Sequence, residues 1–172
     1  YPSVMNWENE PGKRGYRKPT YPLGEYFKSD IIMAAKMMSK DVYSNVKIIT
    51  EEYDIDQLVM LYHSHHVLVY PTWGEGFGFI PLQALASGMP TITTYPWAEY
   101  KEFIGPLALK SKLTDEVTPK SVGDAHIGKM FKPDAKHLED LMYDAVINFK
   151  PYSGYYFAQS TKIHEEYNWI KL

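Results

Sequence analysis

The sequence predicts an α/β domain of Rossmann-like architecture, in which a mainly parallel sheet lies between two layers of helices. Between residues 46 and 94, short apolar runs alternate with amphipathic segments, which is typical of strands joined by helical crossovers. Residues 66–70 (HVLVY) are apolar without alternation, as in a strand buried on both faces. A Gly-rich loop then leads from this run into a helix. The length of 172 residues suits a single domain, which we expect to span residues 1–172.

The first part of the chain predicts three elements before the central pattern begins. Residues 1–7 read as a strand, and residues 8–22, rich in Gly, Pro and charge, read as a loop. An apolar face of helical period predicts a helix over residues 23–39. Residues 46–50 (VKIIT) predict the first strand of the sheet.

A helix is expected to begin at Asp54, because Gln57 follows three residues later and approximates a capping box. After the strand at residues 66–70, the next helix is expected over residues 81–87. Pro81 suits its first turn, and Gly88 suits the position just beyond its last turn.

The remainder of the chain predicts a strand, a long loop and a helical end. The further expected elements are a strand at 91–94, a loop at 110–126, a short strand at 129–132, and helices at 134–149 and 155–167.

Composition excludes several classes of function. The net charge is −3 and no long basic run occurs, so neither nucleic acid nor an anionic membrane is indicated as a partner. The absence of cysteine excludes disulfides, zinc thiolate sites and cysteine nucleophiles. No apolar stretch approaches a membrane span and no signal-peptide pattern opens the chain, so we expect a cytoplasmic protein. Because the chain begins at Tyr1 and is short, we expect a piece of a larger protein.

The loop after residues 66–70 carries the residue types that bind a nucleotide. Gly74, Gly76 and Gly78 let the backbone approach a ligand closely, and backbone N–H groups at the start of the next helix favour an anion such as a diphosphate. Glu75 and Gln83 lie eight residues apart, so their side chains can face one pocket and bind sugar hydroxyls.

Two other interpretations of this loop remain open. A dinucleotide-binding fingerprint requires G-x-G-x-x-G, whereas this loop reads G-x-G-x-G. The glycines can also form a tight turn with no ligand, leaving Glu75 as a solvated carboxylate. Among the histidines, His63, His65 and His66 cluster at a helix end, where contact with terminal carbonyls is favoured over a metal site.

Residues 61–94 (LYHSHHVLVYPTWGEGFGFIPLQALASGMPTITT) resemble the C-terminal domain of retaining GT-B glycosyltransferases of the glycogen-synthase and mannosyltransferase-like group. Looser similarity extends to residues 128–142 and to Trp169. The resemblance implies that the chain is the donor-binding half of a GT-B fold.

The resemblance implies specific roles for the loop. Glu75 matches the first glutamate of the family's Glu-x7-Glu motif and is expected to contact the donor sugar as a catalytic residue. The backbone of Gly76, Phe77 and Gly78 is expected to lie against the sugar and the diphosphate. Gln83 stands where the family's second glutamate holds the ribose, a departure that weakens the hydrogen bond by removing its charge.

The family also neutralises the leaving diphosphate with cations from an earlier loop. Lys18 is expected to be the catalytic lysine, with Arg17 or Arg14 beside it, although a solvated basic loop is the alternative. Glu99 and Glu102 stand near a family glutamate, but a surface helix carboxylate is the favoured interpretation of Glu102.

The expected function is therefore transfer of a sugar, with retention of configuration, from a nucleotide-sugar to an unknown acceptor. The donor is expected to be UDP- or GDP-linked, with no further cofactor and no metal. An N-terminal domain of the same protein is expected to supply the acceptor site, so that the isolated chain transfers poorly. Two alternatives are a non-catalytic nucleotide-sugar-binding or scaffolding domain and a different Rossmann-like nucleotide binder.

Overall fold

The computed structural model of the chain describes residues 9–10, 13–14, 45–47, 49, 51–114 and 129–168. The chain divides into two compact units, Tyr1–Glu52 and Tyr53–Leu172, each of which is described by itself. The single domain over residues 1–172 stays a prediction.

In the first unit, two short strands form an antiparallel pair. These are β1 (Asn9–Glu10) and β2 (Lys13–Arg14), with Asn9 opposite Arg14 and Glu10 opposite Lys13. They lie in the segment expected to be a loop, so that prediction was wrong at these positions. A two-residue ladder uses only backbone groups, which a polar composition does not preclude.

The other predictions for this unit are mostly untested. The strand expected at residues 1–7 and the helix expected at residues 23–39 lie outside the described residues. Within the strand expected at residues 46–50, the described residues Val46, Lys47 and Ile49 belong to no strand, so this prediction was wrong there.

The second unit is built on a three-stranded parallel sheet. Its strands are β3 (Leu68–Tyr70), β4 (Thr91–Thr94) and β5 (Ala108–Leu109), in the order β3-β4-β5. β4 pairs in parallel with both neighbours. The expected parallel sheet is confirmed, and the carboxyl ends of the three strands meet at one edge.

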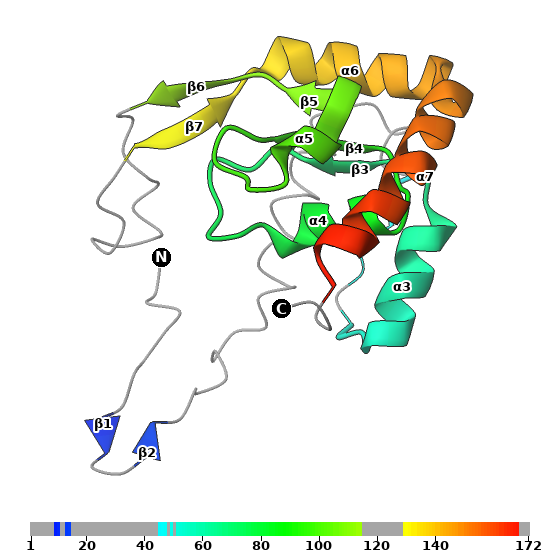
Figure 1. Ribbon diagram of the computed structural model, residues 1–172. Coiled ribbons are helices and arrows are strands. Elements are labelled where there is room, and N and C mark those ends of the chain that lie inside the picture. The colour runs from blue at the N-terminus through cyan, green and yellow to red at the C-terminus, as the bar shows by residue number, and fades with distance from the viewer. Residues whose placement is uncertain are drawn as a thin grey trace. The chain divides into compact units, whose positions relative to one another are not determined.

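Helices cover both faces of this sheet. All four residues of β4 are buried, and Figure 1 shows the sheet between α6 (Ala135–Ile147) on one side and α4 (Phe79–Ala86) on the other. The arrangement is a mixed α/β fold compatible with a Rossmann-like domain.

β3 is shorter and less buried than its sequence predicts. It begins at Leu68, and Val69 is 37% exposed, so the expected burial of residues 66–70 on both faces was wrong. β3 borders the described part of the sheet, with β4 as its neighbour on one side. An apolar run does not distinguish a central strand from a bordering one.

Helix α3 (Ile55–Ser64) confirms the expected capping box. The backbone N–H of Gln57 donates to Asp54 Oδ1 at 2.8 Å, and that of Asp54 donates to Gln57 Oε1 at 3.0 Å. The apolar face of α3 packs through Leu58 and Tyr62 against Ala84 and Met89. This packing joins α3 to α4.

Helix α4 begins two residues earlier than expected, after Gly78. Pro81 still lies in its first turn, where the missing N–H has no intrahelical partner to lose. Gly88 has a φ of +74° and follows the C-cap residue Ser87, which confirms its expected position.

Between β4 and β7 the chain forms elements that were not expected. These are α5 (Lys101–Ile104), the 3₁₀ turn η1 (Gly105–Leu107), β5 and β6 (Ser111–Thr114). β6 pairs antiparallel with β7 (Met130–Pro133) in a separate two-stranded sheet. The prediction of a loop over residues 110–126 was therefore wrong at residues 111–114, which form β6. The strand expected at residues 129–132 is confirmed with a shift of one residue.

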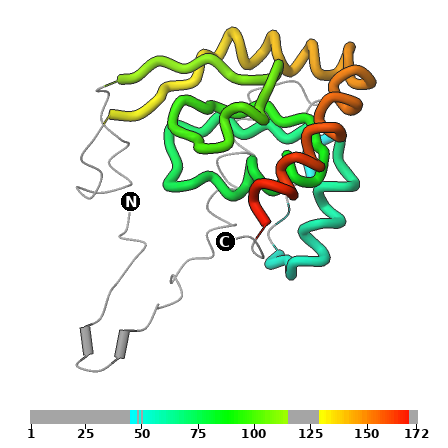
Figure 2. The backbone as a smooth tube through the Cα atoms, viewed as in Figure 1, coloured from blue at the N-terminus to red at the C-terminus, as the bar shows by residue number. Residues whose placement is uncertain are grey.

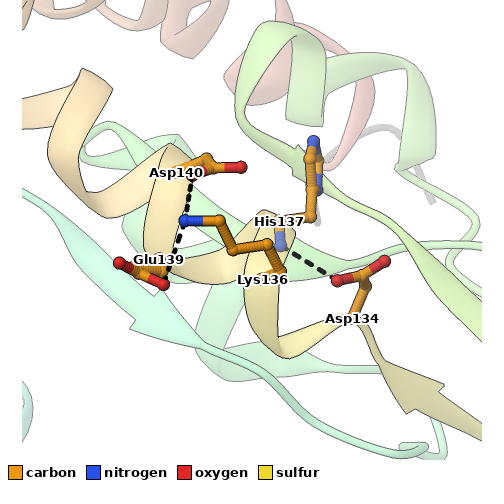
Figure 3. A network of polar contacts seen from close by, with 5 residues as sticks. All are labelled: Asp134, Lys136, His137, Glu139 and Asp140. Carbon is orange, nitrogen blue, oxygen red and sulfur yellow. Dashed lines mark hydrogen bonds and ion pairs between the residues drawn. The ribbon is translucent and has the colours of Figure 1, made fainter.

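Helix α6 has a side-chain cap at its start. Asp134 Oδ1 accepts a hydrogen bond from the backbone N–H of His137 at 2.9 Å. Figure 3 shows this cap beside Lys136, which pairs with Glu139 at 3.2 Å and Asp140 at 3.0 Å. These exposed ion pairs add little stability compared with the cap.

Helix α7 (Phe149–Glu166) follows α6 directly and starts six residues before its expected start at residue 155. Pro151 lies at the third position of this helix, where proline is tolerated. Figure 2 follows the chain from α6 into α7, which packs against α4.

The larger of two hydrophobic clusters in the second unit takes side chains from α4, β4, α5, η1, β5, α6 and α7. Its largest fully buried members are Tyr100, Tyr156, Leu85, Ile92, Ile104, Leu107, Leu109 and Ile163. None of the helices in the described ranges has the length and apolar composition needed to cross a membrane.

Candidate functional site

The segment between β3 and α4 lies at the carboxyl edge of the parallel sheet, where α/β folds bind ligands. Its start is fixed by threonine hydroxyls. Thr94 Oγ1 donates to the carbonyl of Thr72 at 2.5 Å, and Thr93 Oγ1 donates to the carbonyl of Tyr70 at 2.9 Å. Thr72 Oγ1 in turn donates to the carbonyl of Gly74 at 2.9 Å. The loop is therefore anchored to two neighbouring strands.

The β6–β7 hairpin flanks the same loop. The backbone N–H of Phe131 donates to the carbonyl of Trp73 at 2.8 Å. The ammonium of Lys132 lies 5.8 Å from the centre of the Trp73 ring, which suits a cation–π contact. The hairpin thus brings a cation to a residue two positions before Glu75.

Glu75 is exposed and held by one tyrosine. The hydroxyl of Tyr70 donates to Glu75 Oε1, and burial together with this carboxylate raises the pKa of Tyr70 to about 12. A carboxylate has about four acceptor positions, so Glu75 keeps acceptors for a ligand's hydroxyl groups. Tyr70 therefore orients the carboxylate and occupies only one of its acceptor positions.

Gly78 makes the turn into α4 possible. Its φ of +83° is the left-handed region, and a Cβ there would lie 2.2 Å from Tyr100 Oη and 2.9 Å from the ring of Trp97. The hydroxyl of Tyr100 donates to the carbonyl of Gly78 at 2.6 Å, and burial raises the pKa of Tyr100. Gly76, in contrast, faces open space.

Phe77 anchors the loop through the contacts of its ring. The ring is half-buried, and the ring centres lie 4.9 Å from Phe79, 6.0 Å from Tyr100 and 6.4 Å from Tyr167. These aromatic contacts hold the Gly76–Phe77–Gly78 backbone in place.

The N-terminus of α4 is not capped by a side chain. Its N-cap residue is Gly78, and its first turn contains no acidic residue. The first N–H groups of a helix lack intrahelical acceptors and carry the positive end of the helix dipole, so this terminus suits an anion.

Gln83 points toward α3. The hydroxyl of Tyr62 donates to Gln83 Oε1 at 3.3 Å and lies 3.4 Å from the carbonyl oxygen of Ile80. Gln83 lines a hollow of about 390 Å³, and Glu75 is not among the residues that line it. The lining residues are Ile55, Leu58, Val59, Tyr62, His63, Gln83, Ala86, Ser87, Phe157, Ser160 and His164. A pocket shared by Gln83 and Glu75 stays a prediction.

Comparison with known proteins bears on this loop directly. Residues 29–111 match the family described as glycosyl transferases group 1, and this match includes β3, the Gly-rich loop, α4 and β4. The matches support a group 1 glycosyltransferase. Over 68 residues the chain is 34% identical to the O-antigen chain mannosyltransferase RfbU of Salmonella typhimurium.

The similarity to this mannosyltransferase covers 39% of the present chain but only 19% of the relative's length. No solved structure matches the chain. The comparisons therefore show similarity to group 1 glycosyltransferases, and they leave sugar transfer, retention of configuration, the donor and the acceptor as predictions.

The structure does not test the expected positions of the cations. Lys18 and Arg17 are outside the described residues, and Arg14 belongs to β2 in the first unit. Glu99 and Glu102 are exposed, and Glu102 lies in the first turn of α5, as expected of a surface helix carboxylate.

The three histidines are exposed at the end of α3. The ring nitrogen Nδ1 of His65 donates to the carbonyl of Leu61 at 2.8 Å, which confirms the expected contact with a terminal carbonyl. Within the described ranges, no group of three or more His, Cys, Asp or Glu side chains is placed to hold a metal ion.

Sequence reasoning missed the residues that support the loop. Tyr70 was detectable as the last residue of the strand, five positions before Glu75. Tyr100 and Lys132 were not detectable, because their contacts with the loop depend on how α5 and the hairpin pack.

Proposed function

We propose that this chain binds the nucleotide-sugar donor of a group 1 glycosyltransferase and forms the C-terminal half of a GT-B fold. The observation that carries the proposal is the loop between β3 and α4. It joins an exposed, oriented carboxylate at Glu75 to an uncapped helix N-terminus at the carboxyl edge of a parallel sheet.

The proposed roles follow from the chemistry of a nucleotide-sugar. The donor's diphosphate is placed at the N-terminus of α4, against the backbone of Gly76, Phe77 and Gly78, because these N–H groups favour an anion. Glu75 accepts hydrogen bonds from the sugar hydroxyls. Gln83 is assigned to the ribose, for which its amide supplies both donors and acceptors.

The remaining parts of the proposal concern the whole enzyme. Lys18 and Arg17 neutralise the leaving diphosphate, which gathers negative charge in the transition state. A further domain of the protein provides the acceptor site, the configuration is retained, and the donor is UDP- or GDP-linked. No additional cofactor or metal is assigned, and the proposed location is the cytoplasm.

The test is calorimetric titration of the chain with UDP-, GDP- and ADP-sugars, with Glu75→Ala and Lys18→Ala as variants. We expect one donor to bind saturably and Glu75→Ala to weaken it by about tenfold to a hundredfold, as for a hydrogen bond to a charged group. We expect Lys18→Ala to weaken it as well. Glu139→Ala, an exposed carboxylate on α6, is the matched control and should leave affinity unchanged.

Equal donor affinity in wild type and Glu75→Ala would contradict the role of Glu75. A folded chain that binds none of the donors would contradict donor binding by this chain.

A second candidate function is a nucleotide-sugar-binding or scaffolding domain that does not catalyse transfer. The observation that favours it is the position of Gln83, whose amide oxygen already accepts a hydrogen bond from Tyr62. Transfer assayed with the full-length protein separates the two candidates, since only the first predicts turnover that Glu75→Ala abolishes.

A further inference from the structure

One face of the β6–β7 hairpin gathers lysines. In the antiparallel register, Lys112 lies directly opposite Lys132. Side chains opposite each other share a face with their Cβ atoms about 5 Å apart, and like charges in such a pair destabilise the hairpin. An anion bound between the two ammonium groups would offset this repulsion.

A third lysine joins the same face. Lys110 precedes Lys112 by two residues, and its carbonyl accepts a hydrogen bond from the backbone N–H of Asp134 at 2.9 Å, so the ladder continues to this point. All three lysines line one hollow of about 210 Å³, together with Ser111, Pro133 and Asp134. We call Lys110, Lys112 and Lys132 the lysine face.

Basic side chains outnumber acidic ones in the lining of the hollow. Asp134 is its only acidic lining residue, and Asp134 Oδ1 already accepts the capping hydrogen bond from His137, as Figure 3 shows. In the described part of the chain, no ion pair joins Lys110 or Lys112 to a carboxylate. Three lysines and one acidic side chain therefore line the hollow.

The lysine face lies near the Gly-rich loop. Lys110 directly follows β5, so it stands at the same carboxyl edge of the sheet as the loop after β3. The hydrogen bond from Phe131 to Trp73 and the position of Lys132 over the Trp73 ring connect the hairpin to that loop.

We infer that the lysine face binds the phosphate or diphosphate group of a ligand. Lysine ammonium groups bind phosphate as point charges. The hollow is several times the volume of a water molecule, about 30 Å³, so it has room for such a group. If the proposed function holds, the group is the donor's diphosphate, which then contacts the lysine face as well as the N-terminus of α4, and this part of the inference rests on that function.

The first test titrates the chain with inorganic pyrophosphate. We expect saturable binding that weakens with added salt, and at least a tenfold loss of affinity in the double variant Lys112→Gln/Lys132→Gln. Lys150→Gln, an exposed lysine on α7, is the matched control and should bind as wild type does. Absence of pyrophosphate binding, or equal binding by the double variant, would overturn the inference.

Thermal unfolding with and without pyrophosphate provides a second test that does not require a measured affinity. Pyrophosphate should raise the unfolding temperature of the wild type, because a ligand that binds only the folded state stabilises it. The double variant should unfold at the same temperature with and without pyrophosphate. An equal rise in both proteins would place the anion elsewhere.

The second test identifies the source of the phosphate group, using the nucleotide-sugar that binds best and its nucleoside without phosphate. If the double variant weakens the nucleotide-sugar as much as pyrophosphate but leaves the nucleoside unchanged, the group is the donor's diphosphate. If it weakens pyrophosphate alone, the lysine face binds the phosphate of another ligand. Pyrophosphate binding that depends on the lysines, with no nucleotide-sugar binding, would refute the proposed function and leave this inference standing.

Discussion

At the scale of single residues, the conformation of the candidate site depends on contacts with tyrosines outside the Gly-rich loop. Gly78 has left-handed backbone geometry directly beneath the hydroxyl of Tyr100, and Glu75 is oriented by Tyr70. The conformations of Gly78 and Glu75 are thus not fixed by their sequence neighbours alone. Substitutions at these positions therefore separate the shape of the loop from its chemistry.

Gly78→Ala should destabilise the protein by about 3 kcal/mol. The left-handed conformation costs a non-glycine residue about 1–2 kcal/mol, and overpacking adds about 1–3 kcal/mol, because the new Cβ would meet Tyr100 and Trp97. Urea denaturation followed by tryptophan fluorescence measures the effect. Gly76→Ala is the control and should change the free energy of unfolding by no more than about 0.5 kcal/mol, since its Cβ meets open space. Similar losses in both variants would contradict the steric argument.

Tyr70 should titrate near pH 12 in the folded protein, compared with its ordinary value of 10.0. Between these two values the unfolded chain has lost the proton that the folded chain retains, so the free energy of unfolding decreases as the pH rises. The contribution is fully present below pH 10. NMR of the Tyr70 ring carbon bonded to oxygen reports the titration.

Glu75→Gln should lower the pKa of Tyr70 but leave it above 10, because burial is the larger cause and remains. A pKa of Tyr70 that does not change in Glu75→Gln would show that the two side chains do not interact in solution.

At the scale of elements, capping residues set where helices begin, and the effect of a proline or glycine depends on its position in the helix. Asp54 with Gln57 starts α3 and Asp134 starts α6, as capping patterns predict. Pro151 and Gly154 do not separate two helices, because the first turn of α7 tolerates proline and the rest of the helix tolerates one glycine. The glycine should nevertheless cost stability.

Gly154→Ala should stabilise the protein by about 1 kcal/mol, since alanine is favoured over glycine by this amount inside a helix. A Cβ at Gly154 meets nothing within 4 Å, so no strain offsets the gain. Thermal unfolding measures the increase. Gly88→Ala should in contrast destabilise the protein, because Gly88 has a φ of +74° and a Cβ there would lie 3.4 Å from the Phe157 backbone. A destabilising Gly154→Ala would contradict the helical assignment at this position.

At the scale of the second unit, α7 connects distant segments of the chain. Tyr156 is fully buried, its hydroxyl donates to the carbonyl of Ile104, and it accepts a hydrogen bond from the backbone N–H of Leu107 at 3.3 Å. The same helix packs against α4, which begins at the candidate site. The position of α7 therefore affects the support of the Gly-rich loop.

Tyr156→Phe should destabilise the protein by about 2 kcal/mol, because it removes a buried hydroxyl that bonds both the Ile104 carbonyl and the Leu107 N–H. Burial also raises the pKa of Tyr156, which fits a hydroxyl that stays protonated in the core. The free energy of unfolding from urea titration checks the value. Tyr143→Phe, on the exposed side of α6, should have almost no effect, and equal losses in the two variants would contradict the role of the buried hydroxyl.

The sequence by itself determined what is encoded within a few neighbouring residues. The α/β class, the capping box at Asp54, the turn at Gly88 and the Gly-rich loop before α4 all follow from local periodicity and backbone preference, and the structure confirms them. The tertiary structure alone decided the exposed border position of β3, the pairing of β6 with β7, and the contact of Tyr100 with Gly78. The β6–β7 pairs and the contact of Tyr100 with Gly78 join residues that are 16 to 22 positions apart, so no local pattern specifies them. The candidate site combines both kinds of information: a loop that the sequence marks, and the tyrosines and lysines that packing brings to it.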